Sequence, residues 1–423
     1  MLKSISTLLM LAALPGGAQA ATQVIHAGRV ITEAGKPALG PSTIIVTDGR
    51  IISVEPGTKP GPAGASIIDL TTKTVLPGLI DMHVHLGGDP GGDFRDEAVY
   101  TDEYLTLVCA KNAAITVRAG FTTVRELSAT ARGGFALRNA IRAGLVPGPR
   151  IVEAGQAISI VGGHGDVSGF RPEVNAALDG NNTCTGAVQC AQRVREAAKA
   201  GADVIKITAT GGVLSQQGRG LGQHFTDAEM EAVVSTAHSL GLRVAAHAHG
   251  ARGIEAASRA GVDTIEHGTF ADEAALKVMK AKGTVFVPTL MAFTGIRERL
   301  GKGVYTPTVE QKVRETISQV GKALRNAHAM GIPIAFGTDS GVFEHGRNAE
   351  ELAQMVDLGG MSAPDVLASA TTVAAKYLDL DKEVGRIAPG YSADMIAVDG
   401  DPMADIRTLE KVKFVMARGV VVE

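Results

Sequence analysis

The chain has 423 residues, of which 45% are hydrophobic and 20% are charged, and its formal net charge is −3 at pH 7. This composition is ordinary for a globular enzyme, and the length is sufficient for a barrel of about 250 residues with further elements. The sequence has no long basic segment, which argues against nucleic acid as a partner because phosphate binding needs clustered Lys and Arg.

The N-terminal residues 1–20 have the pattern of a secretory signal peptide. Lys3 precedes an apolar stretch from Ile5 to Leu14, and Ala18-Gln19-Ala20 matches an A-x-A cleavage site. The apolar stretch is too short to span a membrane. We therefore expect cleavage after Ala20, a periplasmic or secreted protein and no stable membrane span. The alternative is a buried N-terminal helix.

The two ends of the chain resemble each other. Residues 21–74 contain strand-like segments such as STIIVTDGRIISV, and residues 379–423 contain GYSADMIAVDG and KVKFVMARGVVVE. Both regions have strand periodicity and Asp-Gly turns. We expect them to pair into one small β-sandwich, with residues 75–378 inserted between its halves.

The middle of the chain alternates apolar strand-like segments with helical patterns. The strand-like segments are, in chain order, LPGLIDMHVH, FTTVREL, RIVEAG, VIKIT, RVAAHA, TIEHG, TVFVPTL and IAFGTDS. This alternation predicts a parallel sheet, and eight units predict an α/β fold with a closed (β/α)8 TIM-like barrel. Residues 226–229 resemble a helix capping box. An open doubly wound sheet is the alternative, but no strand–G-x-G-x-x-G–helix unit supports it.

The chain contains three cysteines. Cys184 and Cys190 flank a short polar loop, and an oxidising compartment favours a local disulfide between them. Cys109 lies in an apolar helical pattern and is expected to be an unreactive core residue. The absence of a C-x-x-C motif argues against a thiolate zinc site.

Polar residues stand at the ends of several predicted strands, where a barrel of this type places its chemistry. His83 and His85 end the first strand and share one face, because side chains two residues apart on a strand point the same way. His247 ends the fifth strand, His267 the sixth and Asp339 the eighth. Four imidazoles and one carboxylate form a ligand set that suits zinc or a similar divalent ion.

Lys206 lies in the fourth strand, between Ile205 and Ile207. Burial favours the neutral amine, which can add carbon dioxide and become a carbamate. A carbamate is an anion that could bridge two metal ions. The alternative is a lysine paired with a nearby carboxylate, and the local sequence does not decide between the two.

The combination of these residues resembles the amidohydrolase superfamily in its binuclear form. The resemblance covers nearly the whole mature chain and includes PGLIDMHVH and GRIAPGYSADMIAVDGDP. The motifs VIKITATGGV, AHAHG, IEHGT and VGGHGD resemble the branch that contains prolidase-like and Xaa-Arg-type metallo-carboxypeptidases, near the ochratoxin-hydrolysing amidohydrolases.

This resemblance implies a role for each ligand candidate. It implies two divalent ions, preferably zinc, with His83, His85 and Asp339 on the more buried ion, His247 and His267 on the more exposed ion, and the Lys206 carbamate bridging both. A bridging hydroxide would attack the substrate carbonyl. Asp339 would take the proton and deliver it to the leaving amine.

Three further residues are candidates for substrate contacts. His164, in a glycine-rich loop after the third strand, is expected to polarise the substrate carbonyl or hold a carboxylate, unless it only bonds its own turn. Arg219, in the loop after the fourth strand, could pair with a substrate carboxylate, although exposed arginines often have no specific role. His249 follows His247 by two residues and could support the site or simply begin a helix.

Met291, Phe293 and Tyr305, in the long segment after the seventh strand, are expected near the entrance, in an apolar wall or lid. The alternative is that this segment forms an oligomer contact.

These features leave three functions open. The first is an amide hydrolase that releases a C-terminal amino acid from N-acyl amino acids or dipeptides, with an ochratoxin-type amide as one possible small-molecule substrate. The second is a cyclic-amide hydrolase of the imidazolone or hydantoin type. The third is a periplasmic metal-binding protein without turnover. Export favours the first, and large barrels of this kind commonly form homo-oligomers.

Overall fold

The computed structural model describes residues 22–90, 98–129, 132–215 and 220–423. Two of the predictions, the signal peptide at residues 1–20 and the substrate contact at Arg219, lie outside these residues. Within the described ranges, no helix combines the length and apolar character that a membrane crossing requires.

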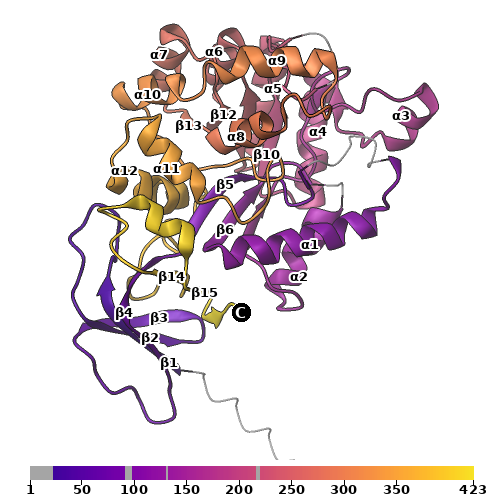
Figure 1. The fold of residues 1–423 in the computed structure, drawn as a ribbon. Helices are drawn as coiled ribbons and strands as arrows, with labels where there is room; N and C mark the ends of the chain where they lie inside the picture. Colours follow the sequence, from indigo (N-terminus) through magenta and orange to yellow (C-terminus); the bar gives the residue numbers. More distant parts are fainter. Residues whose placement is uncertain (1–21, 91–97, 130–131, 216–219) are drawn as a thin grey trace, which may run out of the picture.

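The larger part of the molecule is a ring of parallel strands covered by helices (Figure 1). Three strands form one parallel sheet and four form another, both in chain order. They are β5 (Leu79–Val84), β6 (Phe121–Glu126), β7 (Arg150–Glu153), β10 (Val204–Thr208), β11 (Arg243–Ala248), β12 (Thr264–His267) and β13 (Val285–Val287). Two short strands, β8 (Ser159–Ile160) and β9 (Thr183–Cys184), pair with each other above the ring.

The eighth predicted strand, residues 334–340, joins the ring without forming a regular ladder. The Ala335 N–H donates to the Phe286 carbonyl on β13 at 3.0 Å, and the His85 N–H donates to the Ser340 carbonyl at 2.8 Å. This segment therefore lies between β13 and β5 and completes the ring on that side. The prediction of a barrel is confirmed, but its eighth strand is less regular than the sequence predicted.

The irregularity has a local cause. Pro333, directly before this segment, has no N–H to donate to a ladder, and Asp339 has a φ of 62°, far from strand geometry. On the opposite side of the ring, the Asp203 N–H donates to the Glu153 carbonyl at 2.8 Å and links β10 to β7. Scattered hydrogen bonds and isolated bridges thus replace regular ladders at the two junctions between the sheets.

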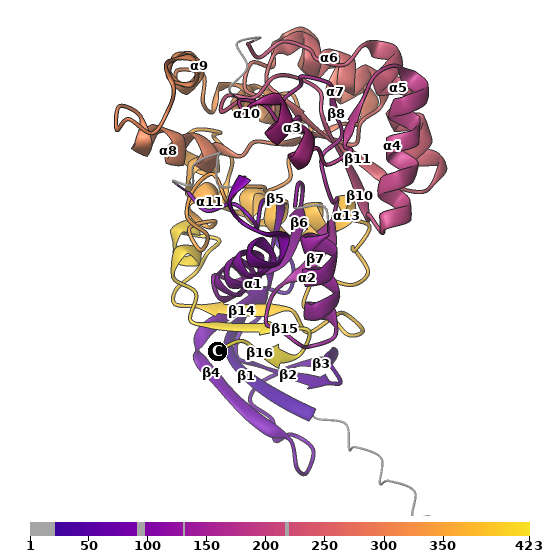
Figure 2. The same cartoon turned by 90° about the vertical axis from the view of Figure 1, so that its right-hand side faces the viewer.

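Helices connect the strands and cover the outside of the ring (Figures 1 and 2). They are α1 (Asp102–Arg118), α2 (Gly133–Arg142), α3 (Pro172–Leu178), α4 (Ala187–Ala200), α5 (Asp227–Ser239), α6 (Ala251–Ala260), α7 (Glu273–Lys282), α8 (Leu290–Arg299), α9 (Pro307–Ile317), α10 (Lys322–Ala329), α11 (Glu350–Asp357), α12 (Ala363–Ala368), the π-helical turn η2 (Ser369–Val373), α13 (Ala374–Tyr377) and the 3-10 helix η3 (Ile406–Lys411). The capping box predicted at the start of α5 is present, with Thr226 and Glu229 bonded reciprocally to each other's backbone.

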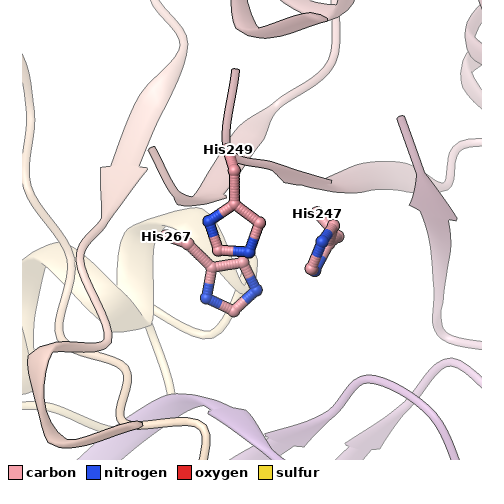
Figure 3. A group of neighbouring side chains, drawn as sticks. All are labelled: His247, His249 and His267. Carbon is pink, nitrogen blue, oxygen red and sulfur yellow. The ribbon is translucent and has the colours of Figure 1, made fainter. Parts of the chain in front are cut away.

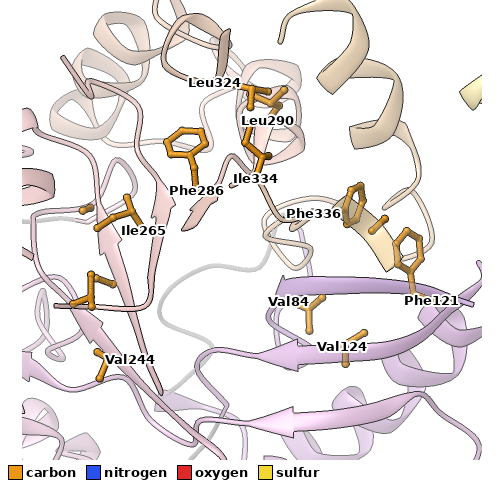
Figure 4. Packing of buried hydrophobic residues seen from close by; sticks show 14 of the residues in the cluster. Val84, Phe121, Val124, Val244, Ile265, Phe286, Leu290, Leu324, Ile334 and Phe336 are labelled. Atoms are coloured by element: carbon orange, nitrogen blue, oxygen red, sulfur yellow. The ribbon is translucent and has the colours of Figure 1, made fainter. Parts of the chain in front are cut away.

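Buried apolar side chains fill the space between the strands and the helices (Figure 4). Phe121 on β6 stacks on Phe336 of the eighth segment, with ring centroids 5.5 Å apart. On the other side of the ring, Ile265 and Phe286 pack in the same cluster as Leu324 on α10. This packing holds the strands in place and leaves their C-terminal ends to carry the polar residues.

The two ends of the chain form a separate small domain, as predicted. Its seven strands make one sheet in the order β16-β15-β14-β4-β1-β2-β3. They are β1 (Thr22–Val30), β2 (Ser42–Thr47), β3 (Arg50–Pro56), β4 (Ser66–Pro77), β14 (Met395–Val398), β15 (Phe414–Ala417) and β16 (Val420–Val421). The long strand β4 pairs with β1 on one side and with β14 on the other. The strands expected as a sandwich are therefore hydrogen-bonded as one sheet, with a shared core that includes Ile44, Val75 and Met416.

The favoured disulfide is present: Cys184 on β9 is bonded to Cys190 on α4. Cys109 on α1 is a buried free thiol, as expected. Burial raises its pKa to about 12, which leaves it protonated and unreactive at neutral pH.

Candidate metal centre

The first group of potential metal ligands lies where β5 meets the eighth segment. The Nε2 atom of His85 lies 3.1 Å from Oδ1 of Asp339, and the Nε2 atom of His83 lies 3.4 Å from the same oxygen. Each of the three residues places a ligand atom within 4.8 Å of the others. Asp339 reaches this position from a left-handed backbone conformation (φ 62°), and strained backbone of this kind concentrates at functional sites.

The second group consists of three histidines: His247 on β11, His249 directly after this strand, and His267 on β12 (Figure 3). His247, His249 and His267 also place ligand atoms within 4.8 Å of one another. Their rings are held by hydroxyl groups: Nδ1 of His267 lies 2.7 Å from Oγ1 of Thr289, and Nδ1 of His249 lies 2.8 Å from Oγ1 of Thr269. His249, which we expected to contact the substrate, is therefore part of this group.

Lys206 on β10 lies between Ile205 and Ile207 and is only 3% exposed. Its Nζ atom lies 3.4 Å from Nε2 of His83, and Lys206 lines the same cavity as the second group. Burial lowers the pKa of this lysine to about 8, against the opposing effect of nearby carboxylates. This shift increases the fraction of neutral amine near neutral pH, which is the form that the carbamate hypothesis requires.

Four of the histidines favour the neutral form. Burial lowers the pKa of His83 to about 4 and that of His249 to about 3. Burial also holds the pKa values of His247 and His267 well below the ordinary value, and the neighbouring imidazoles add to this effect. Neutral imidazole is the form that binds a metal ion, so these rings are prepared as ligands.

His85 behaves differently from the other four. Burial lowers its pKa, but the carboxylates of Asp339 and Glu126 outweigh burial and raise the pKa to about 9. Burial likewise raises the pKa of Asp339, and the neighbouring histidines outweigh it and leave the pKa well below its ordinary value. The two residues therefore form a charged pair in which a metal cation could take the place of the proton on His85. The nitrogen and oxygen donors of both groups fit divalent metal ions such as zinc.

Buried charged residues behind the β5 histidines were missed by sequence reasoning. Oε2 of Glu266 lies 2.9 Å from Nδ1 of His83, and Oε1 of Glu126 lies 3.6 Å from Nδ1 of His85. Arg125 pairs with Glu266 at 2.8 Å. Burial raises the pKa of Glu266, but Arg125 and His83 outweigh it and leave the pKa at about 2. The overlooked signal was the presence of charged residues inside the apolar segments FTTVREL and TIEHG.

His164 lies beside the second group, as its loop position predicted. Its ring centroid is 4.2 Å from that of His247, and its Nδ1 atom lies 2.5 Å from Oγ of Ser215. Ser215 belongs to the loop after β10, and Lys312 on α9 anchors this loop by donating to the carbonyls of Gly212 (2.9 Å) and Ser215 (2.6 Å). Burial lowers the pKa of His164 to about 3, so it stands as a neutral ring at the cavity wall.

A cavity of about 720 Å³ opens above the two groups. One part of the lining is apolar and includes Val213, Phe293 and Ile296, as expected for Phe293. Met291 and Tyr305, expected beside it, do not line the cavity. Another part is polar and includes Asp166 and Asn182. Among the described residues that line the cavity, Lys206 is the only lysine or arginine. The volume is that of a small-molecule site.

Comparisons with known proteins agree with this geometry. Residues 74–422 match the model of the amidohydrolase family. The ochratoxinase of Aspergillus niger is 29% identical over 420 residues, which cover 94% of this chain and 85% of that protein. A solved Xaa-Pro dipeptidase with methionine bound in its active site is 36% identical, with a TM-score of 0.86 over 95% of this chain and 100% of that one. The crystal structure of the Aspergillus niger ochratoxinase superposes with a TM-score of 0.82 at 26% identity, over 96% of both chains.

The chain therefore belongs to the amidohydrolase family. Its relatives and its buried histidine and carboxylate groups define a metal-dependent hydrolase that acts on amide or peptide bonds. This confirms the reaction class expected from the motifs.

Proposed function

We propose that this protein is an exported binuclear-metal amidohydrolase that releases a C-terminal amino acid from N-acyl amino acids or dipeptides, including ochratoxin A. The observation that carries the proposal is the pair of ligand groups at the base of a cavity of about 720 Å³. Support for the substrate class comes from the relatives, an ochratoxinase and a Xaa-Pro dipeptidase.

In this proposal, His83, His85 and Asp339 hold one ion and His247 and His267 hold the other, with zinc as the preferred metal. Lys206, as a carbamate, links the two groups. When bound, two such ions lower the pKa of a water molecule and polarise the substrate carbonyl. His249 belongs to the second group by distance and competes with that assignment as a ligand.

Asp339 is the proton carrier of the proposed reaction. Its carboxylate lies between the two groups, 3.1 Å from His85 Nε2 and 4.0 Å from His267 Nδ1. A carboxylate in this place can accept the proton of the attacking water and pass it to the nitrogen of the leaving amine. His164, held by Ser215, orients the substrate carbonyl from the cavity wall.

Export rests on two observations. The first 20 residues have the pattern of a signal peptide. The disulfide between Cys184 and Cys190 is typical of proteins that fold in an oxidising compartment. N-terminal sequencing of the protein recovered from the periplasm and the medium would test this part, and a chain that retains residues 1–20 in the cytoplasm would contradict it.

The substrate class is tested by amino-acid release from a panel of N-acyl amino acids, dipeptides and ochratoxin A, with metal content measured in parallel. Release with about two metal ions per chain supports the proposal and ranks the substrates. Two ions without release, together with turnover of imidazolones or hydantoins, would move the function to cyclic amides. A metal-loaded protein that is inert to both panels would be a binding protein.

A further inference from the structure

A charged pair lies inside the barrel beneath the first ligand group. Arg125 on β6 is 1% exposed and Glu266 on β12 is fully buried, and Nη2 of Arg125 donates to Oε1 of Glu266 at 2.8 Å. The strands β6 and β12 belong to different sheets of the ring, so Arg125 reaches across the interior. A buried ion pair loses the hydration of both groups and often adds no net stability over apolar residues of similar size. Stability alone therefore does not account for this pair.

The remaining contacts of the pair fix the carboxylate of Glu266 in place beside His83. Arg125 also donates from Nε to the Met82 carbonyl at 2.6 Å and from Nη1 to Oγ1 of Thr264 at 3.2 Å. The Thr264 hydroxyl donates to Oε1 of Glu266. One oxygen of Glu266 is thus held by Arg125 and Thr264, and the other lies 2.9 Å from Nδ1 of His83.

This arrangement selects the nitrogen that His83 presents to a metal ion. A carboxylate paired with a guanidinium accepts hydrogen bonds, so Nδ1 of His83 carries the hydrogen and Nε2 keeps its lone pair. Nε2 of His83 faces the rest of the site, 3.4 Å from Nζ of Lys206 and 3.4 Å from Oδ1 of Asp339. The ring therefore has both its tautomer and its direction set from behind.

We propose that Arg125 and Glu266 are positioning residues that hold His83 in the tautomer and orientation that present Nε2 to the metal ion. This inference rests on the proposed function, since it assumes that His83 is a ligand. The other β5 histidine has weaker support, because Glu126 Oε1 lies 3.6 Å from Nδ1 of His85, beyond a normal hydrogen bond. The effect of the pair is thus concentrated on His83.

Metal affinity is the readout that separates positioning from a merely structural role. The parent protein, Glu266→Gln and the matched control Glu351→Gln would be stripped of metal and titrated with Co²⁺, with a chromophoric chelator as competitor and the visible spectrum recorded. Glu351 is also fully buried, and it accepts backbone N–H groups from Leu290 (2.8 Å) and Met291 (2.6 Å) rather than a ligand. Both variants replace a buried carboxyl group by an amide, but only Glu266→Gln disturbs the support of His83.

We expect Glu266→Gln to raise the dissociation constant of one of the two ions by about 10- to 100-fold and to shift the Co²⁺ absorption. The control should keep both affinities and the parent spectrum. Unchanged affinities and spectrum in a folded Glu266→Gln protein would overturn the inference. If that variant does not fold, Thr264→Val carries the same test with a smaller expected rise, and an unchanged constant there would overturn it.

The parent titration keeps this test separate from the proposed function. A parent protein that binds no Co²⁺ would contradict the proposed binuclear centre itself. A parent that binds two ions, with a Glu266→Gln variant identical to it, would contradict only the role of Arg125 and Glu266.

Discussion

The mouth of the barrel and the seven-stranded sheet bury polar groups in opposite ways. At the mouth, fully or nearly buried charged and imidazole groups such as His83, Glu266 and Asp339 gather around one point. In the sheet, the buried cluster is apolar and includes Ile44 and Met416. Charged residues such as Arg50 form ion pairs at the surface, and Asp394, directly before β14, is a single buried carboxylate rather than part of a cluster. Burying charge is costly, so its concentration in one region identifies the region under functional constraint.

The largest expected effect is the loss of hydrolytic activity when the carboxylate of Asp339, at the mouth of the barrel, is changed to an amide. Asp339→Asn removes the proposed proton carrier, and we expect the rate of amide hydrolysis to fall by about 10²–10⁴-fold without loss of the folded state. Asp379→Asn is a matched control, because Asp379 also has a positive φ (56°) but pairs with Arg243 at the surface. Steady-state kinetics and thermal unfolding measure both effects. Near-normal turnover in Asp339→Asn would contradict the proposed role.

A core substitution in the sheet should show the reverse pattern. Ile44 on β2 is completely buried, and Ile44→Ala should lower the free energy of unfolding by about 2–5 kcal/mol through lost packing and the cavity that remains. The rate per folded molecule should stay at the parent value, because the sheet contributes no ligand group. Denaturant unfolding and kcat, normalised to metal content, test this expectation. A large fall in kcat would mean that the sheet also shapes the site.

The apolar wall of the cavity should affect substrate binding more than the chemical step. Phe293 on α8 lines the cavity and lies edge-on to His249, with ring centroids 6.3 Å apart. Phe293→Leu should raise KM about 10-fold for substrates with a large apolar side chain, through loss of about 1–3 kcal/mol of contact. Val313→Ala is the control, since Val313 packs in the same cluster but does not line the cavity. Equal KM changes in both variants would point to a general loosening of the cluster.

The smallest expected effect concerns a helix cap on the outside of the barrel. Thr226→Ala removes the side-chain cap of α5 and should lower the free energy of unfolding by about 1 kcal/mol without a change in activity.

Burial raises the pKa of Glu229, but hydrogen bonds from the Thr226 and Gly186 amides outweigh it and leave the pKa below its ordinary value of 4.5. The stability that Glu229 contributes is therefore present above the ordinary pKa of 4.5 and is lost as the pH falls through the lower pKa of the folded state. Unfolding curves of Glu229→Gln between pH 7 and pH 3, which should lack this loss, provide the check.

Much of the fold and of the site followed from local sequence patterns. The alternation of strands and helices was sufficient for the barrel, because each βα unit carries its own periodicity and turn residues. Five of the six predicted ligands stand at or near the end of an apolar strand, and Lys206 lies within one. The ring then brings these strands together. Their individual roles remain predictions.

The parts that were missed depend on contacts between distant segments. Arg125 and Glu266 are 141 residues apart in the chain, and neither local sequence indicates that the two residues form an ion pair. The irregular eighth segment has an apolar strand-like pattern in IAFGTDS, but the left-handed backbone of Asp339 is set by its place beside His83 and His85. The membership of His249 in the second group could not be predicted from the sequence, because its spacing from His247 fits either a ligand or a helix start. Only the three-dimensional arrangement of β11 and β12 shows that its ring lies beside those of His247 and His267.

The long strand β4 has a consequence for the order in which the protein is made. Its neighbours are β1, which is synthesised before it, and β14, which begins at Met395 near the end of the chain. Chains emerge from the ribosome with the N-terminus first. The edge of β4 that pairs with β14 therefore stays unpaired while more than 300 residues are translated. An unpaired strand edge can form hydrogen bonds with other chains and so promote aggregation. If the protein is exported as proposed, a delay of folding until the whole chain has crossed the membrane would shorten this exposure.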